Sequence, residues 1–456
     1  MSVIEYLSAS QTTKDQDTVG ETPSSIISRK SLGFSFWAVV VPNIFFLIIS
    51  PFYLAGRLIS PFLFLMAALV ALFAPRAVAI AAFLLAATVD LSLIIMLAFS
   101  LPLDVALDSL RHFAEINPAS SALYVAVVFI VASTACFAAI AISKNRMKFR
   151  KASLLPALLL AASASAADYV FTWPYVKKPD VAFDSARLQT GMTSSAIAES
   201  QRNLLIVMVE GLGAFGDEAE RDIFQKLLTA GKAQERFTVE RGSSYYNGST
   251  TGAAARELCG RWGDYIDYIQ STGPFDCLPN QLRAAGFETT AVHAFGTDMF
   301  QRDVWYPRIG FENLQFMDTL SEEQPERFEA RCGSVFEGLC DEDVSEAVHD
   351  RLTGASEKPQ FVYWLTLNSH IPFLNHQTDT MQCRTETPKM QNKTVCELAN
   401  IWASVFERVN KIASDPSLPP TDILVVGDHH TPLWERAAKN RFVLDKVDWY
   451  LMRYTD

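Results

Sequence analysis

Five apolar runs occupy the first part of this 456-residue chain and restrict its fold more than any other feature. The runs lie at about residues 34–55, 58–74, 77–100, 123–143 and 152–171. Each approaches the roughly 20 apolar residues that an α-helix needs to cross a bilayer, although the second is short and the fifth is diluted by alanine and serine. We therefore expect a five-helix transmembrane domain over residues 34–171.

Charges between the apolar runs orient this domain. Basic residues crowd between the fourth and fifth runs, at 144–151, and three more precede the first run. The loop at 101–122 instead carries three carboxylates and a single arginine. Since basic segments stay in the cytoplasm, we expect a cytoplasmic N-terminus and, after five crossings, an extracytoplasmic chain beyond residue 171.

The segments around the apolar runs are polar. Residues 1–33 are rich in serine and threonine and lack an apolar core, so we expect a disordered cytoplasmic tail and no cleaved N-terminal signal. Residues 172–202 form the expected linker. The small residues at 161–168 resemble a signal-peptide cleavage site, but we expect the segment to be retained. Asp90 lies inside the third run, and we interpret it as a packing residue that meets a polar partner between helices.

Six of the seven cysteines follow the membrane domain: Cys259, Cys277, Cys332, Cys340, Cys383 and Cys396. An even number suits disulfides in an oxidising, extracytoplasmic compartment. Pairing between sequence neighbours is one of fifteen connectivities and stays open, as does a set of reduced cysteines in the cytoplasm. The net charge of −11 argues against a nucleic-acid partner, because no basic stripe offsets the repulsion by phosphates.

Beyond the linker, apolar strands alternate with helices. We expect strands at 203–210, 287–293, 361–367 and 422–428. We expect helices near 217–231, 278–285, 343–353 and 395–413. This alternation predicts an α/β domain over residues 203–456, with a mostly parallel, doubly wound sheet and helices on both of its faces.

Metal-binding side chains follow two of these strands directly. Glu210 ends a run of six apolar residues, and Asp428 and His429 end the strand at 422–428. Ligands gather at the carboxyl edge of such a sheet, and two carboxylates with an imidazole suit Zn²⁺ or Mn²⁺. Taken singly, a helix cap explains Asp428 and a surface imidazole explains His429.

Thr250 is the predicted nucleophile, in a turn of small and hydroxyl residues at 248–252. A bound metal lowers the pKa of a coordinated hydroxyl, so a threonine can attack phosphorus without a dedicated base. Thr251 is adjacent, and spacing does not separate the two. An ordinary N-cap before a helix at 253–258 also explains the turn, and it is compatible with catalysis because a helix N-terminus attracts phosphate.

Three further residues are candidate phosphate contacts. His293 ends the strand at 287–293, and Arg302 suits a bidentate grip on phosphate oxygens. His370 follows the strand at 361–367 and suits stabilisation or protonation of a leaving oxygen. Each of these residues alone is more readily explained by a structural role.

The order of these residues resembles the sulfatase-like phosphotransferases of the alkaline phosphatase superfamily. Among these, it resembles the lipoteichoic acid synthases, the periplasmic glucan phosphoglycerol transferases and, less closely, the phosphoethanolamine transferases. Glu210 and the pair Asp428–His429 stand at the family's metal-ligand positions. Thr250 stands at the position of the nucleophile, with the glucan enzymes' spacing to the Cys-Gly pair that begins at Cys259.

The remaining motifs extend this resemblance. His293 and Arg302, nine residues apart, match the histidine and arginine that hold phosphoglycerol in the lipoteichoic acid synthases. His370 in Asn-Ser-His-Ile-Pro-Phe matches the phosphate-contacting histidine. Two positions depart from the pattern: Phe300 stands where the lipoteichoic acid synthases have tryptophan, and His430 replaces the usual glycine or tyrosine.

The resemblance implies an alkaline-phosphatase-like fold and an enzyme of the bacterial inner membrane with a periplasmic catalytic domain. Such an enzyme transfers a phospholipid headgroup, through a phospho-threonine intermediate, to a glycan or a lipid-linked saccharide. The match around His293 and Arg302 favours phosphoglycerol from phosphatidylglycerol. No Cys-x-Pro-x-Arg formylglycine motif occurs, which argues against a true sulfatase.

Other functions stay open. The presumed disulfides favour phosphatidylethanolamine as the alternative donor, whose ammonium group would need a carboxylate or aromatic pocket, for example at Glu257 or Asp298. A hydrolase that releases the headgroup to water uses the same residues. A non-catalytic sensor or assembly partner of a polysaccharide system would be free to lose the nucleophile or a ligand, but here every expected position is filled.

Overall fold

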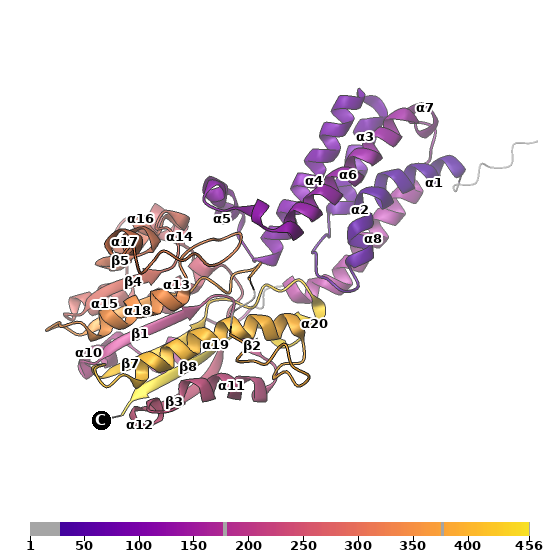
Figure 1. The fold of residues 1–456 in the computed structure, drawn as a ribbon. Helices are drawn as coiled ribbons and strands as arrows, with labels where there is room; N and C mark the ends of the chain where they lie inside the picture. The colour runs from indigo at the N-terminus through magenta and orange to yellow at the C-terminus, as the bar shows by residue number, and fades with distance from the viewer. Residues whose placement is uncertain (1–27, 177–179, 375–377, 456) are drawn as a thin grey trace, which may run out of the picture.

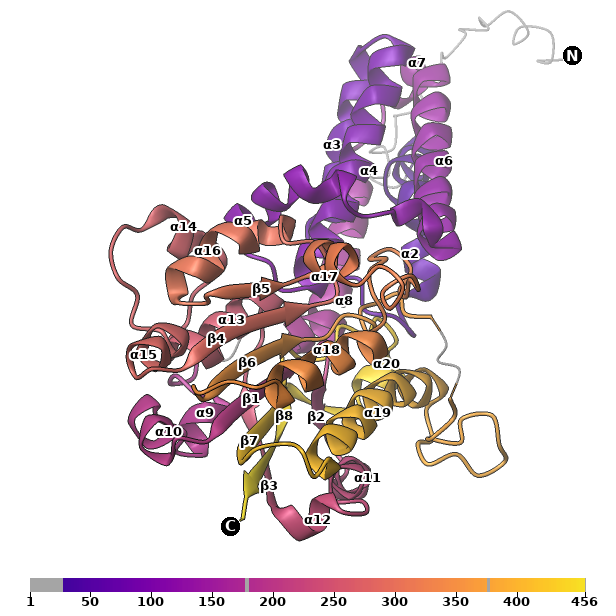
Figure 2. The same cartoon turned by 60° about the vertical axis from the view of Figure 1, so that its left-hand side comes forward.

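The computed structural model describes residues 28–176, 180–374 and 378–455, and it divides into a helical half and an α/β half (Figure 1). The helical half is an elongated bundle that stands on one end of the α/β half, as the turned view also shows (Figure 2). The expected tail at 1–33 lies largely outside the described residues. The first helix already begins at Arg29.

All five predicted apolar runs form helix. Four helical stretches are long and apolar enough to cross a membrane: Arg29–Ile49, Arg76–Ala98, Ala122–Lys144 and Leu155–Tyr175. The second run forms a shorter apolar helix of 14 residues, which packs against the other membrane helices. The elements of this half are α1 (Arg29–Ser35), the π-helix η1 (Phe36–Val40), α2 (Val41–Ile49), α3 (Ser60–Phe73), α4 (Arg76–Ala98), α5 (Leu103–Asp108), η2 (Ser109–Ala114), η3 (Pro118–Ser120), α6 (Ala122–Lys144), α7 (Arg146–Phe149) and α8 (Leu155–Val176).

Asp90 has polar partners inside the bundle, as interpreted from the sequence. It is fully buried in α4 and forms an ion pair with Arg57, and the hydroxyl of Ser60 also donates to it. Arg57 Nη2 donates in turn to Asn43 Oδ1 at 2.7 Å. These contacts offset the cost of burying a carboxylate. They also connect α4 to Ser60 of α3 and, through Arg57, to Asn43 of α2.

The α/β half contains one eight-stranded sheet in the order β2-β8-β7-β1-β6-β4-β5, with β3 paired to β8. Its strands are β1 (Asn203–Val209), β2 (Gly213–Phe215), β3 (Phe237–Tyr245), β4 (Glu288–His293), β5 (Asn313–Gln315), β6 (Gln360–Leu365), β7 (Thr421–Gly427) and β8 (Phe442–Tyr454). The strands from β7 to β5 run parallel, whereas β2 and β3 pair antiparallel with β8. The mostly parallel sheet is therefore confirmed, with an antiparallel edge that the sequence did not indicate.

Helices cover both faces of this sheet. Leu205, Val207 and Val209 of β1 belong to one apolar core with α11, α18 and α19, whereas Leu204 and Ile206 belong to a second core with α13, α15 and α16. This alternation follows from the side-chain period of two along a strand, and burial on both faces explains the continuous apolar run of β1. The helices of this half are α9 (Ala186–Gln189), α10 (Ser194–Ser200), α11 (Glu218–Leu228), α12 (Ala233–Arg236), α13 (Thr250–Cys259), α14 (Tyr265–Gln270), α15 (Leu278–Ala284), η4 (Met299–Gln301), α16 (Arg302–Ile309), α17 (Met317–Glu323), α18 (Asp341–Thr353), α19 (Lys393–Ser414) and α20 (Arg436–Lys439).

Backbone hydrogen bonds join the two halves. The Leu54 N–H donates to the Trp434 carbonyl at 2.7 Å, and the Arg436 N–H donates to the Phe52 carbonyl at 2.8 Å. The loop at 101–122 makes a second connection, in which Val105 is buried in the second core of the α/β half. The membrane bundle is thus attached directly beside the chain that follows β7.

Three disulfides pair the cysteines with their sequence neighbours: Cys259–Cys277, Cys332–Cys340 and Cys383–Cys396. The first links the end of α13 to the residue before α15. Cys136, in α6, is a free thiol.

Replacement of Cys259 and Cys277 by serine tests the first of these links. A disulfide between residues 18 apart restricts the unfolded chain, and its loss lowers stability by about 3 kcal/mol. We expect a lower thermal unfolding midpoint for the full chain in detergent, measured under non-reducing conditions. Cys136→Ser is the matched control, and equal midpoints for the double variant and this control would contradict the expectation.

Candidate functional site

The register of β1 and β7 brings two carboxylates together at the carboxyl edge of the sheet. Val209 of β1 pairs with Gly427 of β7, so the next residues, Glu210 and Asp428, leave the two strands side by side. The Asp428 N–H donates to the Val209 carbonyl at 3.1 Å, which extends the pairing by one residue. Parallel pairing of two apolar strands is therefore what positions these acidic groups.

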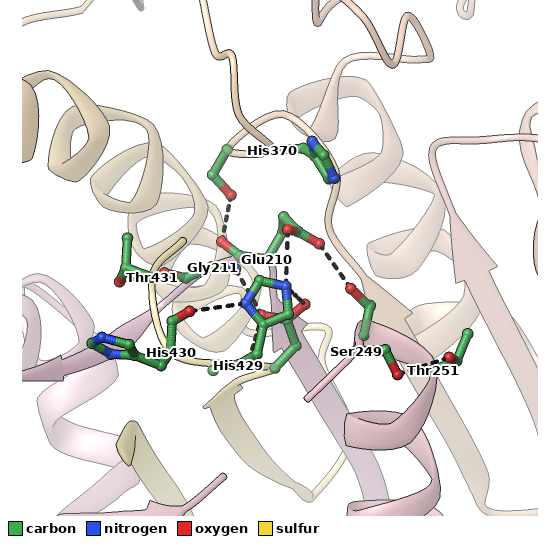
Figure 3. A network of polar contacts seen from close by, with 12 residues as sticks. Glu210, Gly211, Ser249, Thr251, His370, His429, His430 and Thr431 are labelled. Carbon is green, nitrogen blue, oxygen red and sulfur yellow. Dashed lines mark hydrogen bonds and ion pairs between the residues drawn. The ribbon is translucent and has the colours of Figure 1, made fainter. Parts of the chain in front are cut away.

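Glu210, Asp428 and His429 form a buried triad (Figure 3). One ligand atom from each lies within 4.8 Å of the others. His429 Nε2 is 3.4 Å from Glu210 Oε1 and 3.3 Å from Asp428 Oδ2. Asp428 Oδ1 accepts hydrogen bonds from the N–H groups of Gly211 and His429, whereas Oδ2 has no hydrogen-bond partner among the described residues.

The electrostatics of the triad fit a divalent cation. Burial and the nearby charge of Glu210 raise the pKa of Asp428. Burial also opposes the charged forms of Glu210 and His429, but the surrounding opposite charges lower the pKa of Glu210 and raise the pKa of His429 to about 9. Without a metal, raised pKa values therefore favour protons on Asp428 and His429. A Zn²⁺ or Mn²⁺ ion would take the place of these protons and supply the positive charge that the carboxylates need.

Close backbone contacts explain the glycine that precedes Asp428. A Cβ on Gly427 would lie 1.9 Å from the carbonyl oxygen of Leu212. Arg256 Nη2 donates to the Gly427 carbonyl at 2.9 Å, and Nη1 donates to the Asp428 carbonyl at 3.3 Å. Arg256 is fully buried and fixes the end of β7, a role that the sequence did not indicate.

Glu257 is not available to a headgroup, which corrects the proposed ammonium pocket. Its side chain is fully buried and accepts a hydrogen bond from Arg256 Nε at 2.8 Å. Its two carboxylate oxygens also accept the N–H groups of Ala186 and Arg187. Asp298, the second carboxylate considered for that pocket, is exposed.

The two adjacent threonines have different environments. Thr250 begins α13, and its Oγ1 donates to Glu210 Oε2 at 3.3 Å. Thr251 is buried, and its hydroxyl donates to Asp264 Oδ1 at 2.7 Å. Ser249 is the N-cap of α13, accepts the Gly252 N–H, and also donates to Asp264. Of the two hydroxyls, that of Thr250 faces the triad, whereas that of Thr251 stabilises the turn.

His293 ends β4, which is separated from β1 by β6, and Arg302 begins α16. His293 Nδ1 lies 2.9 Å from the Leu365 carbonyl, which fixes the proton on Nδ1 and leaves Nε2 as an acceptor. Burial and the charge of Arg302 lower the pKa of His293 to about 3, so its ring is neutral. Arg302 is 3% exposed, and its Nε has no hydrogen-bond partner among the described residues. A buried guanidinium with an unused donor suits an anionic ligand.

His370 lies above Glu210 at the same edge (Figure 3). Its Nδ1 is 2.8 Å from the Ile371 carbonyl, and its ring contacts those of Phe336 and Phe99 with centroid distances of 4.0 and 5.8 Å. Burial lowers its pKa, so the ring is neutral with Nε2 as an acceptor.

Several residues that the sequence did not indicate hold the backbone of the site. The Glu210 carbonyl accepts hydrogen bonds from Ser369 Oγ at 2.7 Å and Trp402 Nε1 at 3.0 Å. Asp341 accepts the N–H groups of Leu367 and Asn368 and thereby anchors the loop that carries His370. The position of the serine beside His370 could have indicated this role from the sequence. Nothing in the sequence indicates that a tryptophan on α19 makes such a contact.

The sheet order and the triad define an alkaline-phosphatase-like α/β domain with a candidate metal centre. The sulfatase family model matches residues 202–449, more than half of the chain, and the protein belongs to this family. No curated protein matches the sequence.

Several solved structures are similar to this chain at low sequence identity. The lipoteichoic acid synthase LtaP from Listeria monocytogenes is 12% identical, with 56% of this chain and 65% of that chain covered and a TM-score of 0.40. The phosphoglycerol transferase GacH from Streptococcus pyogenes, in complex with sn-glycerol-1-phosphate, is 15% identical, with 60% and 76% covered and a TM-score of 0.39. The periplasmic domain of EcEptC from Escherichia coli, in complex with Zn, is 14% identical, with 56% and 73% covered and a TM-score of 0.37. The chain thus spans less than two thirds of the length of the first of these proteins.

Metal binding should release protons. His429 carries a proton at pH 7 when no metal is bound, because its pKa is raised to about 9, and a metal needs the neutral imidazole. The apparent affinity for Zn²⁺ should therefore rise about tenfold per pH unit for each proton released between pH 6 and 8. Calorimetric titration of the metal-stripped full chain, in two buffers with different ionisation enthalpies, measures this release. Affinity that is independent of pH would count against the triad as the ligand set.

Proposed function

We propose that this protein transfers the headgroup of a phospholipid, with phosphoglycerol from phosphatidylglycerol favoured, to a glycan or a lipid-linked saccharide. The single observation that carries the proposal is the hydrogen bond from Thr250 to Glu210 at the edge of the triad. It aims a helix-terminal hydroxyl at a candidate metal site, while Thr251 is held by Asp264. Membership of the sulfatase family and the motif resemblance around Thr250 and Arg302 support the same function.

Glu210, Asp428 and His429 would hold the metal, with Thr250 beside it. The ion supplies positive charge that lowers the pKa of a bound hydroxyl and offsets negative charge on phosphate oxygens. The chain's own contribution is orientation. Strand register sets the two carboxylates, and the N-cap at Ser249 fixes the direction of Thr250.

Transfer proceeds in two half-reactions. In the first, Thr250 Oγ1 forms a bond to phosphorus, and the proton that it loses passes to the neutral His370, whose Nε2 is an acceptor. The bond from phosphorus to the diacylglycerol oxygen breaks, and His370 passes the proton to that oxygen, so neutral diacylglycerol leaves. In the second half-reaction an acceptor hydroxyl attacks phosphorus and gives its proton to His370. The bond from phosphorus to Thr250 Oγ1 then breaks, and His370 returns the proton to Thr250.

His293 and Arg302 bind the headgroup in this scheme. The neutral His293 offers Nε2 as an acceptor for a headgroup hydroxyl, and the buried Arg302 offers donors to anionic oxygens. A glycerol headgroup has hydroxyls to donate. The ammonium of phosphatidylethanolamine instead needs a carboxylate, and Glu257 is already bonded to Arg256. Phosphatidylglycerol is therefore the favoured donor.

The membrane arrangement is also part of the proposal. We propose domains at 34–171 and 203–456, joined by a linker at 172–202, with the N-terminus in the cytoplasm and the catalytic domain in the periplasm of a bacterial inner membrane. The four membrane-length helices and the three disulfides of the α/β half support a multi-pass protein with an extracytoplasmic domain. Such an arrangement keeps the triad beside the bilayer that contains the donor.

A covalent intermediate tests the function. The full chain, loaded with Zn²⁺ or Mn²⁺, is incubated with liposomes of mixed phosphatidylglycerol and phosphatidylethanolamine, and its peptides are analysed by mass spectrometry. We expect a phosphoglycerol adduct on Thr250 together with free diacylglycerol, both abolished in Thr250→Ala. Thr251→Ala is the matched control, which should keep the adduct and lower the thermal unfolding midpoint, because it removes the hydrogen bond to Asp264.

Each result has a defined meaning. A phosphoethanolamine adduct would identify phosphatidylethanolamine as the donor and leave the proposed mechanism unchanged. An adduct that survives in Thr250→Ala would remove Thr250 from the nucleophile role. Neither adduct nor diacylglycerol, in protein shown to contain metal, would contradict the proposed function.

Arg302→Gln tests the headgroup site separately. The variant keeps a side-chain donor but loses the buried charge, and a hydrogen bond to a charged group contributes about 1.5–3 kcal/mol. We expect kcat/KM for diacylglycerol release to fall by about ten- to hundredfold, with metal binding unchanged. Parallel metal titration is the control. A variant that releases diacylglycerol at the normal rate would show that Arg302 has only a structural role.

A further inference from the structure

A narrow cleft lies between the membrane helices and the triad. Its walls include residues 97–100 at the end of α4, Tyr175 at the end of α8, and His429, His430 and Lys439 of the α/β half. The enclosed space is about 10 Å³, which is room for one small polar group such as a carbonyl oxygen or a water molecule.

One imidazole in this cleft has no hydrogen-bond partner among the described residues. His430 is 7% exposed, and neither of its ring nitrogens has a hydrogen-bond partner among the described residues. Its ring is turned away from Glu210 (Figure 3), and it is not part of the metal-binding group. Buried polar groups without partners cost free energy, so an imidazole in this state indicates a ligand.

Lys439 adds a buried cation to the same cleft. It is 8% exposed, and burial lowers its pKa to about 8, although the charge of Asp445 opposes this shift. Asp445 Oδ1 itself accepts a hydrogen bond from Asn247 Nδ2. Lys439 offers only donors, and the His430 ring offers one N–H donor, which suits an oxygen atom of a ligand.

The position of the cleft selects the ligand. Phe99 lines it and also stacks on His370 with a centroid distance of 5.8 Å. His370 serves the leaving oxygen in the proposed mechanism, so the cleft lies on the side from which diacylglycerol departs. The other wall is the end of two membrane helices, where the acyl chains of a lipid bound at Thr250 must lie.

We propose that this cleft receives one ester carbonyl oxygen of the donor phospholipid, with Lys439 and His430 donating hydrogen bonds to that oxygen. The proposal rests on the proposed function and adds a lipid-recognition site to it. The headgroup is bound by His293 and Arg302, whereas this second site recognises the diacylglycerol that both candidate donors share. Neither residue takes part in bond making or breaking, so both are substrate-positioning residues.

An ester-for-ether comparison tests the contact. The full chain in lipid–detergent micelles is supplied with phosphatidylglycerol or with its dialkyl ether analogue, which lacks the carbonyl oxygens. We expect the natural chain to prefer the ester lipid by about tenfold in kcat/KM, as for the loss of a charge-assisted hydrogen bond. Lys439→Met should raise KM for the ester lipid by about tenfold and abolish the preference, and Lys439→Arg should restore most of it.

Lys393→Met is the matched control, because that side chain is 83% exposed on α19. It should keep the ester preference. An equal loss with ester and ether lipid in Lys439→Met, or no change of KM in that variant, would overturn the proposal.

A binding measurement separates this proposal from the proposed function. Retention of phosphatidylglycerol and phosphatidylethanolamine is measured by native mass spectrometry in Thr250→Ala, with and without Lys439→Met. Retention that falls about tenfold with Lys439→Met supports the cleft even if the natural chain releases no diacylglycerol, in which case the function fails alone. If phospholipid retention is unchanged while the natural chain releases diacylglycerol normally, the lipid-binding role of the cleft is contradicted and the proposed function stands.

Discussion

The pairing of β1 with β7 is the interaction on which the site depends. It places two buried carboxylates side by side, an arrangement whose electrostatic repulsion must be offset by protons, by an imidazolium or by a metal. The apolar strands cannot relax this repulsion by moving apart, because both of their faces are packed against helices. A strand register that buries apolar residues therefore also creates a strong site for a dication.

Hydrogen bonds from buried side chains to backbone carbonyls hold the triad in place. The fully buried Arg256 donates to the carbonyls of Gly427 and Asp428, and Ser369 and Trp402 donate to the carbonyl of Glu210. Each of these contacts fixes main chain rather than a ligand atom, so none of them occupies a carboxylate oxygen that could bind a metal. This division between backbone support and side-chain ligation is what a preorganised metal centre requires.

The sequence predicted the parts of this structure that follow from local pattern. The strands that lead to Glu210 and Asp428 contain continuous apolar runs, whereas the strand that ends at His293 begins with Glu288, Thr289 and Thr290. In all three, the polar residue at the end marks the edge where ligands gather. The strand β8 was missed because Asp445 and Lys446 interrupt its apolar pattern, and Asp445 has a positive φ of 58°. The roles of Arg256 and Asp341 were also missed, because both depend on contacts between segments distant in sequence, which no local pattern records.

The attachment of the bundle links membrane position to catalysis. The chain after β7 carries His429 and His430 and then, within a few residues, the backbone contacts to residues 52 and 54 of the membrane half. The end of α4 reaches the same region through Phe99, whose ring contacts His370. The junction that orients the α/β half on the bundle thus forms both walls of the cleft. In the proposed mechanism, a lipid that enters along the helices would reach the triad through residues contributed by both halves, so neither half alone would form the lipid-binding surface.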